Sequence, residues 1–289
     1  MTTPSQSPKL QGWALILGAS SGFGGAASIA LAEAGMHIFG VHLDRKATMP
    51  NAERIVATIK QAGREAIFFN VNASDPEKRR EVLDQMEKIL ADRGEPSSVK
   101  VIVHSLAFGT LKPFLAPSPK DAITQIQMDM TLDVMAHSLI YWVQELVMRK
   151  LMVCGGRVYA MTSSGGTRVW AGYGAVSAAK AALESHIRQL AMELAPLGIT
   201  ANAIRAGVTD TPALRKIPGS QKIVQTALEI NPSGRLTTPE DIAAALVVLS
   251  RPETYWMTGN VIGVDGGEDV VGFCISPFAA AGTEKPAPA

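Results

Sequence analysis

A tyrosine and a lysine seven residues apart, Tyr173 and Lys180, could together carry proton-transfer chemistry in this chain. In a helix, seven residues return a side chain to nearly the same azimuth, so the two can share one face. Lys180 can then reach a bound cofactor while Tyr173, near the start of the helix, faces a substrate. A nearby ammonium favours the phenolate and lowers the pKa of a tyrosine, which suits a proton donor near neutral pH. The alternative is an ordinary core helix with one tyrosine and one surface lysine.

A glycine-rich turn separates a predicted strand from a predicted helix near the N-terminus. The strand Trp13–Leu17 is followed by Gly-Ala-Ser-Ser-Gly-Phe-Gly and then by apolar residues at helical spacing up to Gly35. This order is the context of a dinucleotide site, where glycines admit the pyrophosphate and a helix N-terminus presents N–H groups. The spacing is GxxxGxG rather than GxGxxG, and a chance turn of small residues is the alternative. We predict six cofactor-binding residues here: Gly18, Ser20, Ser21, Gly22, Phe23 and Gly24.

Charged residues follow the second predicted strand, Met36–Leu43, where the ribose of an adenosine would lie. His42, Asp44, Arg45 and Lys46 cluster at this point. A carboxylate there pairs with free ribose hydroxyls, whereas an arginine or lysine pairs with a 2′-phosphate. The residues alone therefore leave the choice between NADPH and NADH open, and a solvated charged turn is the alternative for each.

Two further strand ends offer cofactor contacts. The third predicted strand, Ala66–Val71, ends in Asn70 and Val71, which could flank an adenine ring or simply terminate the strand. The fourth, Val99–His104, opens into small and apolar residues where a nicotinamide ribose would sit, and we assign three of them to the cofactor: Ser105, Leu106 and Ala107.

Strands and helices alternate along the rest of the chain, which predicts an α/β fold with a doubly wound parallel sheet of the Rossmann type and helices on both faces. The remaining strands are expected at Gly156–Met161, Thr200–Ile204 and Val261–Asp265. The remaining helices are expected at Asn51–Gly63, Asp75–Arg93, Pro119–Arg149, Pro239–Leu249 and from the tyrosine–lysine segment through Leu197.

One domain is expected over residues 1–275, with no internal repeat. Residues 208–235 hold prolines, glycines and one short amphipathic segment, which predicts a substrate lid that is mobile without ligand and ordered over substrate. The tail 276–289 is small-residue and proline-rich, which predicts disorder.

Composition excludes several function classes. The net charge is +1, from 27 basic and 26 acidic residues, so no basic face for nucleic acid is expected. The two cysteines, Cys154 and Cys274, belong to no metal-ligand spacing and indicate a reducing compartment. There is no secretory leader and no apolar run of membrane-spanning length. A cytoplasmic protein without metal or membrane partner is therefore predicted.

Taken together, the motifs resemble the short-chain dehydrogenase/reductase family. The resemblance extends from Gly12 to Gly267 and rests on the glycine loop, the strand-end SLAFG, the Ser163 region, the tyrosine–lysine helix and the terminal TGNVIGVDGG. It implies a Rossmann fold, a nicotinamide cofactor and, usually, a homotetramer. It further implies that Lys180 binds the nicotinamide ribose and that the segment AGVTDTPAL contributes cofactor contacts: Gly207, Val208 and Thr211.

The spacing of the tyrosine departs from the common family pattern. Most members have Tyr-x-x-x-Lys, and that tyrosine would fall at Val176 in this chain. Tyr173 lies three residues earlier, which is similar to the divergent enoyl-acyl-carrier-protein reductases, in particular the bacterial type III form. The family's proton-relay asparagine aligns with Met135, which cannot transfer a proton. Ser163 stands where the common family keeps a catalytic serine, and both a helper role and an inert remnant stay open.

A chemical argument fits the displaced tyrosine. When a conjugated enone is reduced, the hydride lands on the β-carbon and negative charge collects on an oxygen three bonds away. The proton donor must then sit farther from the hydride than in ketone reduction. The resemblance therefore implies an NAD(P)H-dependent enoyl-thioester reductase, acting on acyl-carrier protein, with Tyr173, Lys180 and Ser163 as catalytic residues. The alternatives are a carbonyl or hydroxysteroid-type reductase and a non-catalytic nucleotide-binding scaffold.

The same alignment favours NADPH over NADH. The position that usually holds the NADH-selecting acid aligns with His42 rather than with Asp44, and Arg45 adjoins the strand end. NADPH is accordingly the expected cofactor, with NADH as the alternative.

Overall fold

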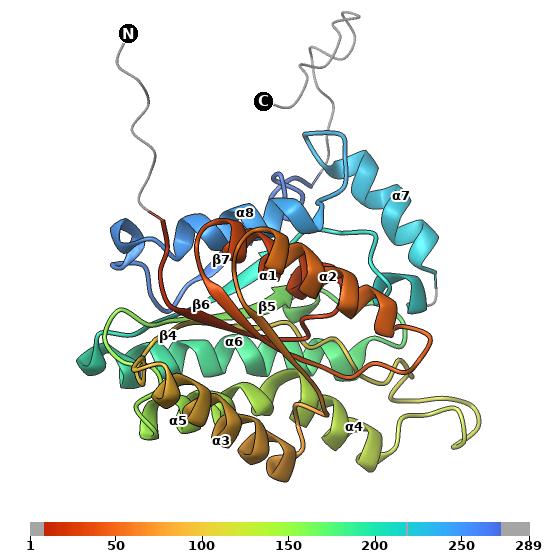
Figure 1. Ribbon diagram of the computed structural model, residues 1–289. Helices are drawn as coiled ribbons and strands as arrows, with labels where there is room; N and C mark the ends of the chain where they lie inside the picture. Colours follow the sequence, from red (N-terminus) through yellow and green to blue (C-terminus); the bar gives the residue numbers. More distant parts are fainter. Residues whose placement is uncertain (1–8, 218, 273–289) are drawn as a thin grey trace, which may run out of the picture.

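A seven-stranded parallel sheet organises the chain in the computed structural model, which describes residues 9–217 and 219–272 (Figure 1). The strand order is β3-β2-β1-β4-β5-β6-β7, so the chain winds outward twice from β1. The strands are β1 (Trp13–Leu17), β2 (His37–His42), β3 (Ala66–Asn70), β4 (Val99–His104), β5 (Arg157–Ser163), β6 (Thr200–Ala206) and β7 (Val261–Val264). The predicted doubly wound fold is confirmed.

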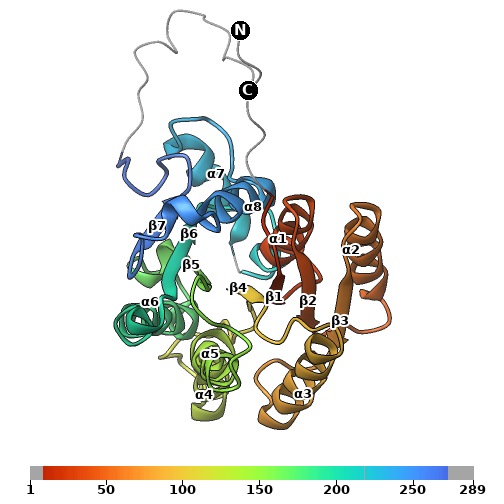
Figure 2. The same cartoon turned by 60° about the vertical axis from the view of Figure 1, so that its left-hand side comes forward.

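Helices cover both faces of the sheet (Figures 1 and 2). One face packs against α1 (Gly22–Glu33), α2 (Met49–Gln61) and α8 (Pro239–Leu249). The other packs against α3 (Pro76–Asp92), α5 (Ser138–Met148) and α6 (Gly174–Leu194). Because both faces are covered, the strands read as continuous apolar runs, and every residue of β1 is buried.

The helix expected over Pro119–Arg149 is broken in the structure. It begins only at α4 (Gln125–Leu132), where Thr124 and Gln127 form a reciprocal capping box. A π-helical turn, η1 (Asp133–His137), then separates α4 from α5. The expected start at Pro119 was wrong because the cap residue, rather than the apolar periodicity, sets where the helix begins.

The predicted lid contains more regular structure than its composition suggested. It holds a 3₁₀ turn, η4 (Leu214–Lys216), and an 11-residue helix, α7 (Ser220–Ile230). In α7 only Ala227 is buried, so this helix lies on the surface above the sheet's carboxyl edge (Figure 1). The predicted tail, 276–289, lies outside the described residues.

No helix in the described part of the chain is long and apolar enough to cross a membrane.

Candidate active site

The carboxyl ends of β4, β5 and β6 open into one largely apolar cavity of about 270 Å³. It is the place where ligands bind in open parallel sheets, at the edge reached by the strand ends. Ten of the residues assigned to chemistry or cofactor from the sequence line it: Phe23, Ser105, Leu106, Ala107, Ser163, Tyr173, Lys180, Gly207, Val208 and Thr211. Its apolar walls include Leu111, Met135, Trp170, Val176, Leu214, Ile217 and Ile223.

Tyr173 occupies the N-cap position of α6, so its backbone turns into the helix at this residue. Its ring lies directly over Gly165, where an added Cβ would come within 2.6 Å of the ring carbon Cε1. The indole of Trp170 meets the same ring edge-on, with centroids 5.6 Å apart. The tyrosine ring is therefore held between a residue that must be small and a large aromatic side chain.

The electrostatics of Tyr173 differ from the sequence-based expectation. Burial raises the pKa of its phenol, and a hydrogen bond with the Ser163 side chain only partly offsets this. Lys180 was expected to lower this pKa, but it is not among the groups that shift it. Within the protein alone, Ser163 is thus the group that favours the phenolate, which supports the helper role left open for this serine.

Lys180 is buried and points at the backbone rather than at the phenol. Its Nζ donates a hydrogen bond of 2.7 Å to the carbonyl oxygen of Met161 in β5. Burial lowers the pKa of this ammonium to about 8, and Glu184 opposes the shift. An ammonium has three donors, so two remain for a ligand in the cavity, which Lys180 also lines.

The glycine loop fits a dinucleotide, because its backbone passes where side chains cannot. A Cβ on Gly18 would lie 2.4 Å from the carbonyl oxygen of Ser105, and Gly18 has a φ of 91°. A Cβ on Gly24 would lie 2.2 Å from the carbonyl oxygen of Gly18. α1 begins at Gly22 with Ser21 as its N-cap, and the Ser21 side chain makes no capping hydrogen bond. The N-terminal N–H groups of this helix can therefore receive a pyrophosphate.

At the end of β2 the carboxylate of Asp44 is fixed beside the glycine loop. His42 Nδ1 lies 2.8 Å from Asp44 Oδ2, and both side chains are largely buried. Burial would raise the pKa of Asp44, but hydrogen bonds from Ser20, Thr48 and His42 outweigh it and lower the pKa. Asp44 is thus a stable anion facing Ser20. Arg45, by contrast, is exposed.

The side chain of Asn70 is hydrogen-bonded to the backbone of Asp44, so it is not available to flank an adenine as the sequence suggested. Its Oδ1 accepts from the backbone N of Asp44 at 2.8 Å, and its Nδ2 donates to the carbonyl oxygen of Asp44 at 3.0 Å. Val71 packs against the hydrophobic core. Asn70 therefore fixes the backbone position of Asp44, a role that its place at the end of a strand did not indicate.

His104, at the end of β4, is buried and neutral. Its Nε2 lies 2.9 Å from Ser138 Oγ, which itself donates to the carbonyl oxygen of Val134. Burial, followed by the charge of Lys180, lowers the pKa of His104 to about 3. This histidine fastens β4 to the kinked α4–α5 region beneath the site.

The sequence reasoning missed Gly165, Trp170 and the lid residues Leu214, Ile217 and Ile223. Gly165 and Trp170 lie in the short segment between Ser163 and Tyr173, so their proximity to the tyrosine was the available signal. The sequence contained no comparable signal for the lid residues, because only the tertiary fold brings them to the cavity.

A Rossmann-type sheet, a glycine loop and one cavity lined by Ser163, Tyr173 and Lys180 are together typical of nicotinamide-dependent oxidoreductases. A family model described as enoyl-(acyl carrier protein) reductase matches residues 18–268. The chain belongs to the short-chain dehydrogenase/reductase family and is an NAD(P)H-dependent oxidoreductase.

Relatives in this family differ in their reactions. The chain is 31% identical over 255 residues to 3-oxoacyl-[acyl-carrier-protein] reductase FabG of Escherichia coli, covering 88% of this chain and 96% of the relative. It is 30% identical over 264 residues to the NADPH-dependent aldehyde reductase-like protein, chloroplastic, of Arabidopsis thaliana, covering 88% and 93%. The solved structure of enoyl-[acyl-carrier-protein] reductase (NADH) from Aquifex aeolicus has a TM-score of 0.77 at 25% identity, covering 91% and 98%.

Proposed function

We propose that this protein reduces the conjugated double bond of enoyl thioesters. The observation that carries the proposal is the placement of Tyr173 at the N-cap of α6, one turn before Val176, the position of the tyrosine in most of the family. Val176 is buried and lines the cavity, so this position offers an apolar wall and no proton donor.

In the proposed reaction Tyr173 hydrogen-bonds the thioester oxygen, stabilises the enolate and supplies its proton. A nicotinamide bound in the cavity supplies the hydride. The apolar walls hold the acyl chain and exclude water, which strengthens the hydrogen bond from the phenol. Ser163 favours loss of the phenolic proton, and Lys180 holds the ribose with its two remaining donors. Residues 208–235 close over the substrate.

The acyl group is proposed to arrive on acyl-carrier protein, as the names of two similar proteins indicate for those proteins. A homotetramer and a cytoplasmic location are part of the same proposal.

For the cofactor, the geometry favours NADH over the NADPH expected from the sequence. That expectation assigned the selecting position to His42, but His42 is buried and serves as a hydrogen-bond partner of Asp44. Asp44 is the anion that faces the glycine loop. A carboxylate there accepts hydrogen bonds from ribose hydroxyls and repels a 2′-phosphate.

A carbonyl reductase is the second candidate, favoured by the Ser163 hydroxyl, which acts to lower the pKa of the Tyr173 phenol and lines the same cavity. The test compares crotonyl and acetoacetyl thioesters, each with NADH and with NADPH, by following nicotinamide absorbance. The proposal expects faster oxidation with the crotonyl thioester. Faster reduction of the acetoacetyl thioester would assign the protein to the carbonyl reductases, and no oxidation with either would favour a nucleotide-binding scaffold.

A further inference from the structure

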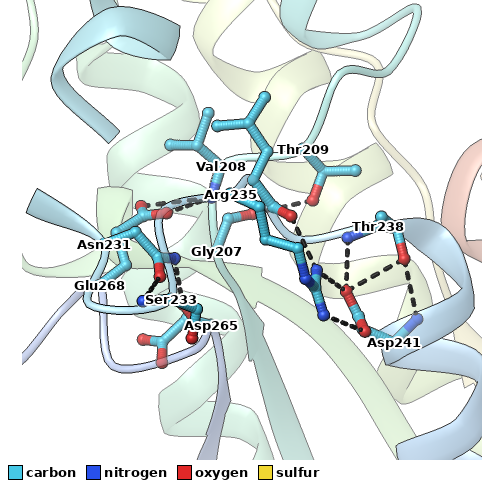
Figure 3. Close-up of polar contacts among 11 residues, drawn as sticks. Gly207, Val208, Thr209, Asn231, Ser233, Arg235, Thr238, Asp241, Asp265 and Glu268 are labelled. Atoms are coloured by element: carbon cyan, nitrogen blue, oxygen red, sulfur yellow. Dashed lines mark hydrogen bonds and ion pairs between the residues drawn. The ribbon is translucent and has the colours of Figure 1, made fainter. Parts of the chain in front are cut away.

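The two ends of the lid meet at one buried carboxylate, that of Glu268 in the turn after β7 (Figure 3). At the start of the lid, the backbone N of Val208 donates to both carboxylate oxygens, at 3.2 and 3.1 Å. At the far end, directly after α7, the side chain of Asn231 lies beside Glu268 and acts to lower the pKa of its carboxyl group. The Nδ2 of Asn231 donates to the carbonyl oxygen of Asp265 at 2.9 Å.

The same two ends are also joined to each other. The backbone N of Thr237 donates to the carbonyl oxygen of Val208 at 3.1 Å. Asn231, Thr237 and Glu268 are each at most 6% exposed. The chain between these ends is more exposed, since among its described residues only Thr209, Leu214 and Ala227 are buried. The lid is thus a loosely packed segment with firmly fixed ends, which is the arrangement of a hinged loop.

A buried carboxylate such as that of Glu268 is an unfavourable choice if its only role is packing between the two ends of the lid. Burial raises the pKa of its carboxyl group, and the neighbouring Asp265 and Asp269 repel its charge. In the described part of the chain, the ion pairs of this turn go to Asp269, which meets Arg168 and Arg205, while Glu268 accepts from the backbone N of Val208. A buried acid without a cationic partner is costly, so a neutral side chain would serve packing alone better.

The hinge also adjoins the cavity. Val208 lines it, and so do the lid residues Leu214, Ile217 and Ile223. A shift of the Val208 peptide therefore moves the wall against which an acyl chain would lie.

We propose that Glu268 is a positioning residue that holds both hinges of the lid, at Val208 and at Asn231, in the geometry from which residues 209–230 close over the substrate. This inference rests on the proposed function, because it assigns the lid to an acyl substrate.

The test compares Glu268→Ala and Glu268→Gln in the full-length chain. Alanine removes both acceptors, whereas glutamine keeps one acceptor oxygen for the backbone N of Val208 and should restore part of the function. In Glu268→Ala, amide hydrogen exchange over 209–230 with bound NADH should be at least tenfold faster than in the wild type. The KM for the acyl substrate should rise about tenfold while kcat stays within about threefold. Glu268→Gln should lie between the two.

Asp75→Ala is the matched control, because the Asp75 carboxylate also accepts two backbone N–H groups, those of Glu77 and Lys78 at the start of α3. This variant should lose stability without any change in lid exchange or KM. The inference is overturned if Glu268→Ala, like Asp75→Ala, changes neither the lid exchange nor KM. If the alanine variant fails to fold, the same criterion applies to Glu268→Gln. The exchange measurement needs only NADH, and KM can be taken on whichever thioester is reduced, so failure of the enoyl assignment is seen separately.

Discussion

Lys180 Nζ donates to the carbonyl oxygen of Met161 at 2.7 Å, which ties the middle of α6 to β5 two residues before Ser163. This bond fixes the ammonium in place before any ligand binds. Fixing a long side chain in advance removes an entropy cost from cofactor binding. Tyr173 and Lys180 thus act from one helix but through different partners, the phenol with Ser163 and the ammonium with the backbone of β5.

The depressed pKa of Lys180 predicts a stability difference that depends on pH. Burial lowers this pKa from 10.5 to about 8 in the folded protein. Between these values the unfolded chain binds more protons than the folded one, so this group makes stability rise with pH. Lys180→Met lacks this contribution. The free energy of unfolding of Lys180→Met minus that of the wild type should therefore fall from pH 8 to pH 10.5, as measured by urea denaturation. A constant difference over this range would contradict a depressed pKa.

Gly165→Ala should impair catalysis through the tyrosine ring. The new methyl group would lie 2.6 Å from Tyr173 Cε1, so the ring must move. A misplacement of ~1 Å can cost about 10²-fold in rate, and kcat should fall by roughly that factor. The dissociation constant of NADH, measured by fluorescence titration, should stay within about twofold, because the ring is not part of the glycine loop.

Gly272→Ala is the control for this substitution, because none of the described residues lies within 4 Å of its Cβ position. It should leave kcat unchanged. A Gly165→Ala enzyme with normal kcat would show that the contact between Gly165 and the ring does not set the position of the hydroxyl.

Cofactor choice should change when Asp44 loses its charge. Charge-assisted hydrogen bonds contribute about 1.5–3 kcal/mol, so Asp44→Asn should raise the KM for NADH by roughly 10–100-fold. The KM for NADPH should fall, since repulsion of the 2′-phosphate is removed. Arg45→Ala, at an exposed position, should leave the KM for NADH nearly unchanged. A wild-type enzyme that prefers NADPH, and loses this preference in Arg45→Ala, would restore the expectation drawn from the sequence.

The fold was predictable because its signals are local. The apolar run Trp13–Leu17 and the glycines after it are recognised from neighbouring residues alone. The alternation of strands and helices predicts a parallel sheet with helices on both faces, whereas the strand order comes from the structure. What failed was the start of α4, where the reciprocal bonds of Thr124 and Gln127 outweighed an apolar pattern that continued upstream.

Spacing along the chain grouped some of the proposed site residues, and position at a predicted strand end supplied others, such as Ser105, which lines the same cavity. Tyr173 and Lys180 share a helix, and the glycine loop is continuous. The bond from Lys180 to Met161, the brace of Asn70 on Asp44 and the contacts of Glu268 join residues from 19 to 60 positions apart. The packing of the sheet determines which of these residues are in contact, and the spacing of residues along the chain does not indicate that packing.

Tyr173→Phe is the decisive substitution for the proposed mechanism. It removes the hydroxyl and keeps the ring that packs over Gly165 and against Trp170. Loss of a general acid typically costs ~10²–10⁴-fold, so kcat for the enoyl thioester should fall within that range. Binding of NADH should barely change, since it depends on the glycine loop, Asp44 and Lys180.

Ser163→Ala distinguishes the proton donor from its helper. Ser163 acts on the phenol by a hydrogen bond that lowers its pKa, so its removal should raise the pKa of Tyr173 further. The loss in kcat should be about fivefold, smaller than that of Tyr173→Phe, because a neutral hydrogen bond contributes about 1 kcal/mol. The double variant should be no worse than Tyr173→Phe alone, since the serine acts through the phenol. If Tyr173→Phe keeps near-normal enoyl-thioester reduction while Ser163→Ala abolishes it, the serine is the proton donor and the role assigned to Tyr173 is wrong.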